Sequence, residues 1–71
     1  MMSLPLKVDK SYSMLINLVR ERGKTPIHNI SKLLKISIEK TEMLVFRGVN
    51  ESYLHKYLED NILMIYPKRL V

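Results

Sequence analysis

Apolar side chains recur at helical spacing in the first third of the chain. Four of them fall at i, i+3, i+4 and i+7 and share one helical face: Tyr12, Leu15, Ile16 and Val19. This pattern predicts a helix over about residues 9–22. Asp9 is placed to cap its start, and Gly23 follows it as a residue that commonly ends helices.

Two further helices are predicted in the middle of the chain. The second covers residues 26–35, with Thr25 or Asn29 as its cap and Pro26 at a position where a missing N–H costs nothing. Ser37 can cap the third helix, which covers about residues 37–47 and ends at Gly48. The predicted core of the three helices is Leu15, Ile16, Val19, Ile30, Leu33, Leu34, Leu44 and Val45.

The segment after residue 50 supports two interpretations. Its apolar residues have helical spacing, which predicts a fourth helix at 50–60 followed by one strand. Alternatively, residues 53–59 and 62–66 form a hairpin around Asp60-Asn61, two residues that tolerate the positive φ of a tight turn. We expect the four tyrosines to lie in the core with their hydroxyls at the surface: Tyr12, Tyr53, Tyr57 and Tyr66.

From Gly23 to Val49 the chain resembles a winged helix-turn-helix domain. The stretch from Lys24 to Ile38 is similar to the second helix and turn of that family, with the rhythm Ile-x-x-Leu-Leu-x-Ile-Ser, and Gly48-Val49 is similar to the pair that leads into the wing. The resemblance implies a mostly α fold, with three helices plus a C-terminal hairpin, in a single domain over 1–71. It also implies that the third helix enters the major groove of DNA.

Charge along the chain bears on the partner. The net charge is +5, with 12 Lys and Arg against 7 Asp and Glu. Residues 1–38 have a balance of +5 and residues 39–66 a balance of −2, while Lys68 and Arg69 add +2 at the end. This distribution favours double-stranded DNA held mainly through phosphate contacts, as in a small transcription regulator. The candidate DNA-binding residues are Lys24, Lys32, Lys35, Lys40 and Arg47, with Lys40 and Arg47 also candidates for groove contacts. Lys35 stands in the turn where Gly is common, a difference that matters little if the residue is helical.

A different partner is suggested by the outer side of the third helix. Met43 and Phe46 lie there beside Glu39 and Glu42; if they are exposed, they indicate a contact with another protein. The alternative function is therefore a protein-binding winged-helix subunit of a larger nucleoprotein assembly. We also expect a homodimer, formed through the first helix and one of the terminal segments, because Met14 and Leu18 widen the apolar stripe.

Several functions are not expected. The chain has no cysteine and only two glycines, so thiol chemistry and a glycine-rich phosphate loop are excluded. Neither the carboxylates nor the two histidines form a catalytic or metal-ligating pattern, so we expect no enzyme, cofactor or metal. The longest apolar run, residues 62–66, is too short to span a membrane, and we expect a cytoplasmic protein.

Overall fold

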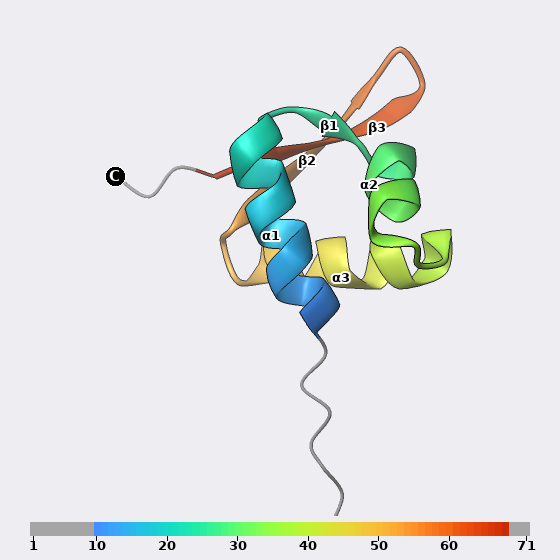
Figure 1. The fold of residues 1–71 in the computed structure, drawn as a ribbon. Helices are drawn as coiled ribbons and strands as arrows, with labels where there is room; N and C mark the ends of the chain where they lie inside the picture. The colour runs from blue at the N-terminus through green and yellow to red at the C-terminus, as the bar shows by residue number, and fades with distance from the viewer. Residues whose placement is uncertain (1–9, 69–71) are drawn as a thin grey trace, which may run out of the picture.

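The structure is a computed structural model that describes residues 10–68. Helices and strands follow one another in this order: α1 (Lys10–Arg22), β1 (Thr25–Pro26), α2 (Ile27–Leu34), α3 (Ile38–Asn50), β2 (Leu54–Glu59) and β3 (Ile62–Pro67). Figure 1 shows the helices grouped against one side of the sheet, while the turn between β2 and β3 projects beyond them. The fold is mostly helical, as predicted.

The C-terminal hairpin is confirmed, and the fourth helix is wrong. β2 pairs antiparallel with β3 from Leu54↔Pro67 to Glu59↔Ile62. The two turn residues, Asp60 and Asn61, have φ values of 51° and 64°, the left-handed conformations that a type I′ turn requires. We call this β2–β3 hairpin the wing. Since β1 pairs with β3, the strand order is β1-β3-β2 and β2 forms an edge.

The core lies between the helices and one face of the sheet. Its buried apolar residues come from every element except the two-residue β1: Leu15, Ile16, Val19, Ile27, Ile30, Leu44, Val45, Leu54 and Ile65. Thr41 is also fully buried, and its hydroxyl donates a 2.8 Å hydrogen bond to the Ser37 carbonyl. A buried hydroxyl with a partner avoids the desolvation cost of an unpaired one.

The start of α2 differs from the prediction. Thr25 does not cap the helix, because its backbone belongs to β1 opposite Ile65 and its hydroxyl donates to the Gly23 carbonyl. Asn29 does not cap it either. Pro26 is the residue before the helix and makes no side-chain cap bond. The long-range strand pairing therefore removes two residues that local capping rules assigned to the helix.

The end of α3 also differs. The helix does not stop at Gly48 but continues to Asn50, and Gly48 is buried within it. A Cβ at this position would lie 2.5 Å from Leu54 Cδ1, so the glycine is required where α3 meets β2. Its function is close packing between helix and sheet, not termination.

Some predicted core residues lie at the surface. Leu33 is 47% exposed, because the buried side of α2 is formed by Ile27 and Ile30 and Leu33 projects away from it. Tyr53 and Tyr57 are exposed too. Tyr57 lies on the outer face of the wing, where its ring meets Tyr66 edge to face at 5.2 Å.

The helix ends show which local rules hold. Ser37 caps α3 as predicted, and Gly23 ends α1 with φ of 78° and a 2.7 Å bond from its N–H to the Val19 carbonyl. The proposed cap Asp9 and both terminal segments lie outside the described residues.

Candidate nucleic-acid interface

A tight turn between α2 and α3 fixes the geometry of the candidate site. Lys35 is left-handed, with φ of 57° and ψ of 45°, so it is not helical as the sequence interpretation had assumed. Its N–H donates to the Lys32 carbonyl, and the Ile36 N–H donates to the Ser31 carbonyl at 3.2 Å. This pair of bonds is the Schellman motif, usually built on Gly. The Ser31 hydroxyl closes the turn by donating to the Ile36 carbonyl at 2.9 Å.

The turn gathers three of the five candidate residues at one corner. Lys32 lies in the last turn of α2, Lys35 at its C-cap and Lys40 in the first turn of α3; all three are exposed. Ser37 Oγ accepts a 3.0 Å hydrogen bond from the Lys40 N–H and so fixes the start of α3. A helix N-terminus carries partial positive charge, which adds to that of the lysines. We call Lys32, Lys35, Lys40 and this helix start the basic corner.

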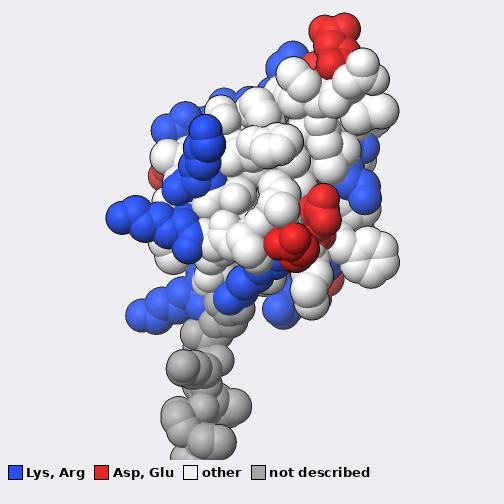
Figure 2. Space-filling model, turned by 90° about the vertical axis from the view of Figure 1, so that its right-hand side faces the viewer, with Lys and Arg blue, Asp and Glu red and all other residues white. Residues whose placement is uncertain are grey.

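Acidic residues adjoin the basic corner. Glu39 and Glu42 are exposed on α3. Figure 2 shows the face of the molecule on the α2 side: Lys and Arg gather at its left and lower parts, and red acidic side chains interrupt a largely uncharged surface to their right. On this face the basic side chains therefore lie mainly to one side of the acidic ones.

Lys24 lies away from the basic corner, at the outer face of the wing. Its Nζ is 3.2 Å from Glu59 Oε1 and 6.0 Å from the centre of the Tyr66 ring. The Tyr66 hydroxyl donates to the other Glu59 oxygen. These two hydrogen bonds lower the pKa of Glu59, and the pairing with Glu59 raises the pKa of Lys24. Lys24 therefore ties the segment before β1 to the wing.

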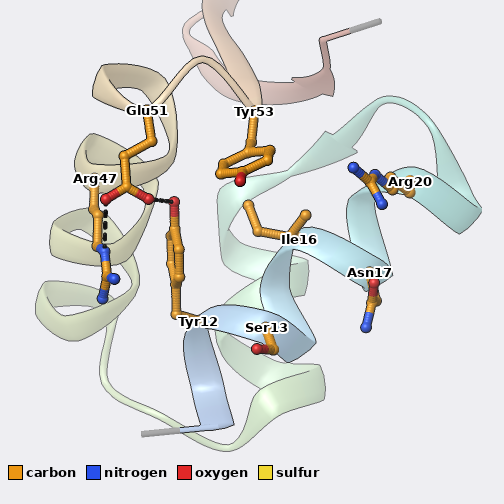
Figure 3. Close-up of a pocket in the computed structure, with 8 residues that line it drawn as sticks. All are labelled: Tyr12, Ser13, Ile16, Asn17, Arg20, Arg47, Glu51 and Tyr53. Atoms are coloured by element: carbon orange, nitrogen blue, oxygen red, sulfur yellow. Dashed lines mark hydrogen bonds and ion pairs between the residues drawn. The ribbon is translucent and has the colours of Figure 1, made fainter. Parts of the chain in front are cut away.

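Arg47 lies near the opposite end of α3, against α1. Its Nε donates to Glu51 Oε2 at 3.3 Å, and its guanidinium carbon lies 4.1 Å from the centre of the Tyr12 ring. Figure 3 shows these side chains at the edge of a hollow of about 460 Å³. Burial, and then the hydrogen bond to Glu51, raise the pKa of Tyr12 to about 12. The structure thus does not bring Arg47 together with the basic corner.

The two residues of the alternative site are both exposed. Met43 is 71% and Phe46 60% exposed on the outer side of α3. Phe46 borders a cleft of about 250 Å³ between α3 and the wing; its lining residues are Ile27, Glu42, Val45, Phe46, Lys56 and Leu63. We call this the α3–wing cleft. Arg47 and the basic corner do not line it.

The arrangement of helices and wing matches a solved structure. The chain aligns with the structure described as the transcriptional regulator SlyA at a TM-score of 0.73 and 17% sequence identity. The fold is a winged helix-turn-helix. The alignment covers 86% of this chain and 44% of the SlyA chain, so this chain spans less than half the length of that protein. Comparisons with protein-family models and with curated proteins find no match.

Within this winged helix-turn-helix, the ion pairs of Lys24 with Glu59 and of Arg47 with Glu51 were not predicted from the sequence. Glu59 lies 35 positions from Lys24, and Glu51 lies 39 positions from Tyr12, so no local pattern connects them. The i,i+4 spacing of Arg47 and Glu51 is the one signal in the sequence that indicates such a contact.

The described residues offer neither a metal site nor a membrane-spanning helix. Across residues 10–68, side chains of the ligating types do not gather into a group that could hold a metal ion. Over the same residues, every helix is too short or too polar to cross a membrane.

Proposed function

We propose that this protein binds duplex DNA as a small regulator of transcription, led by phosphate contacts from the basic corner. The observation that carries the proposal is the position of Lys32 and Lys35, which are exposed in the last turn of α2 and at its left-handed C-cap, next to the N-terminus of α3. Lysines and a helix N-terminus are the groups that neutralise phosphates. The similarity of the fold to a transcriptional regulator supports the same function.

The five candidate residues are expected to contribute unequally. Lys32 and Lys35 are exposed at the corner, whereas Lys24 must leave Glu59 and Arg47 must leave Glu51 before either contacts DNA. Arg47 is the side chain suited to guanine edges, and its pairing makes base reading costly. We therefore propose phosphate-led binding with limited sequence discrimination, by a homodimer, because one module covers few base pairs.

A mobility-shift titration over several salt concentrations tests the proposal. Three lysines at the corner give a log–log slope of about −2.7 per protomer, and participation of Lys24 makes it about −3.6. Lys32→Ala and Lys35→Ala should each reduce the slope by about 0.9 and weaken binding to all sequences alike. Lys24→Ala should change the salt slope less. Lys68→Ala is the matched control, since Lys68 directly follows β3 and its N–H donates to the Tyr53 carbonyl, outside the basic corner.

The proposal fails if no duplex shifts at low salt. It also fails if the Lys32 and Lys35 variants bind as tightly as the parent protein, or if Lys68→Ala weakens binding as much as they do.

The second candidate function is contact with a protein partner through Met43 and Phe46. The exposure of these two large side chains beside Glu39 and Glu42 favours it, because apolar surface on a folded domain marks interaction sites. Replacing Phe46 by Ser would then remove the partner and leave the salt slope of DNA binding per protomer unchanged, because Phe46 contributes no charge. The two functions are compatible, since the basic corner and the α3–wing cleft share no lining residue.

A further inference from the structure

We propose that the α3–wing cleft is the surface through which two copies of this chain dock, around a twofold axis, with Phe46 of each copy entering the cleft of the other. The inference rests on the proposed homodimer and assigns its interface to α3 and the wing instead of the first helix. It uses three observations: the shape of the cleft, the exposed apolar residues at its rim and the charges on its two walls.

The cleft has the size and lining to take an aromatic ring. Its volume is about 250 Å³, and Ile27, Val45 and Leu63 form an apolar floor. A cavity of about 150 Å³ already admits a benzene ring. Phe46 stands at the rim, 60% exposed, and is the large side chain that a neighbouring copy would bring to the same place.

The inner face of the wing extends the apolar surface. Leu58 is 69% exposed and pairs across the hairpin with Leu63, so the two share the sheet face that lines the cleft. In the monomer, Phe46 at the rim of the cleft and Leu58 on this sheet face are both held in water. Docking of a second copy buries both.

The charges of the cleft are self-complementary. Glu42 lines it from α3 and Lys56 lines it from β2. Within residues 10–68, neither makes an ion pair in the structure. A twofold axis exchanges the two walls, so Glu42 of one copy faces Lys56 of the other, twice. This reciprocal match is the property that an isologous interface requires.

The same charges argue against a nucleic-acid backbone in the cleft. A phosphate that bound Lys56 in the cleft would also lie near the Glu42 carboxylate and be repelled by it. A second copy of the chain avoids this repulsion, because its Lys56 faces Glu42. The lysines Lys32 and Lys35 do not line the cleft and stay exposed when two copies dock there.

The test is the oligomeric state of the full chain without DNA, measured by sedimentation velocity over a wide range of concentration. Phe46→Ser should weaken dimerisation at least about tenfold, as expected for an aromatic anchor at the centre of an interface. Glu42→Lys and Lys56→Glu should each weaken it, and the double variant should restore it because the exchanged charges pair again. Glu39→Lys, one turn earlier on α3 and outside the cleft, is the matched control.

Each other outcome overturns the inference. These are a parent protein that stays monomeric at every concentration, a Phe46→Ser dimer as tight as the parent, or a double variant no better than the single ones. Dissociation by Met14→Ser but not by Phe46→Ser would assign the interface to α1. Because no DNA is present, failure here leaves the phosphate-contact proposal standing, and failure of DNA binding leaves this result unchanged.

Discussion

The Tyr12 hydroxyl donates a 2.7 Å hydrogen bond to Glu51, a residue 39 positions away that directly follows α3. Arg47 approaches the same carboxylate and also covers the Tyr12 ring. One acidic side chain thus holds an arginine and a tyrosine from two helices, and it fixes α1 against the C-terminal part of α3. Because the pKa of Tyr12 is raised, the stabilisation from this contact should be lost at alkaline pH.

The first prediction is that Tyr12→Phe removes a stabilisation that is present below pH 10 and lost by about pH 12. The pKa of Tyr12 is about 12 in the folded protein and about 10 in the unfolded chain. Below pH 10 both states hold the proton and the hydrogen bond contributes fully. As pH rises further, the unfolded chain releases its proton first, so the free energy of unfolding falls. Urea unfolding of parent and variant from pH 8 upward measures this difference.

Tyr57→Phe is the control, because the Tyr57 hydroxyl makes no hydrogen bond within residues 10–68. Its stability should follow that of the parent over the same pH range. A gap between the parent and Tyr12→Phe that stays constant from pH 8 to 12 would contradict the assignment of the raised pKa to this contact.

The second prediction separates two neighbouring residues of α2. Ile30 is fully buried, so Ile30→Ala should cost about 2–5 kcal/mol of unfolding free energy. Leu33→Ala should cost about 1 kcal/mol or less, since half of that side chain is already in water. Chemical denaturation measures both. If Ile30→Ala does not fold, Ile30→Val at about 0.5–1.5 kcal/mol replaces it. Equal losses for Ile30→Ala and Leu33→Ala would contradict the burial seen for α2.

Local chemistry made much of the fold predictable. Ser37 caps α3 because a hydroxyl one residue before a helix reaches its free N–H groups, and that rule needs no tertiary information. Asp60-Asn61 formed the wing turn for a similar local reason, the tolerance of both residues for positive φ. Periodicity had favoured a helix for the same segment, and pairing of β3 with both β1 and β2 decided against it.

The errors arose where distant segments meet. Thr25 looks like a helix cap and becomes a strand residue because Ile65, 40 positions later, pairs with it. Gly48 looks like a helix stop and instead makes room for Leu54. The candidate site shows the same division: Lys32 and Lys35 are placed by a local turn, whereas Lys24 is withdrawn to the wing by Glu59.

The third prediction concerns the contact between α3 and β2. Gly48→Ala places a methyl group 2.5 Å from Leu54 Cδ1 and 2.9 Å from its Cγ, and Leu54 is buried and has little room to move. Overpacking costs about 1–3 kcal/mol, against a helix-propensity gain of about 1 kcal/mol. We expect a net loss of up to about 2 kcal/mol in thermal or urea unfolding.

A double-mutant cycle tests the cause of that loss. In a Leu54→Ala background the methyl group added by Gly48→Ala meets no leucine, so the substitution should become neutral or stabilising. Measurements in sulfate keep the less stable variants folded. Additive losses in the two backgrounds would show that the close approach of Gly48 and Leu54 is not the reason.

The last prediction is that Lys35→Gly stabilises the protein while weakening DNA binding. Lys35 holds a left-handed conformation that costs a side-chain-bearing residue about 1–2 kcal/mol, and glycine adopts it freely at some entropic cost in the unfolded chain. We expect a net gain of about 0.5–1 kcal/mol in the free energy of urea unfolding.

The comparison variant is Lys32→Gly, within the last turn of α2, which should lower the free energy of unfolding by up to about 1 kcal/mol. Both variants remove one charge from the basic corner, so both should reduce the salt slope of DNA binding by about 0.9. Opposite changes in stability with equal changes in slope would separate the charge of Lys35 from its backbone conformation. A destabilised Lys35→Gly would contradict the left-handed turn, and an unchanged slope would remove Lys35 from the DNA contact.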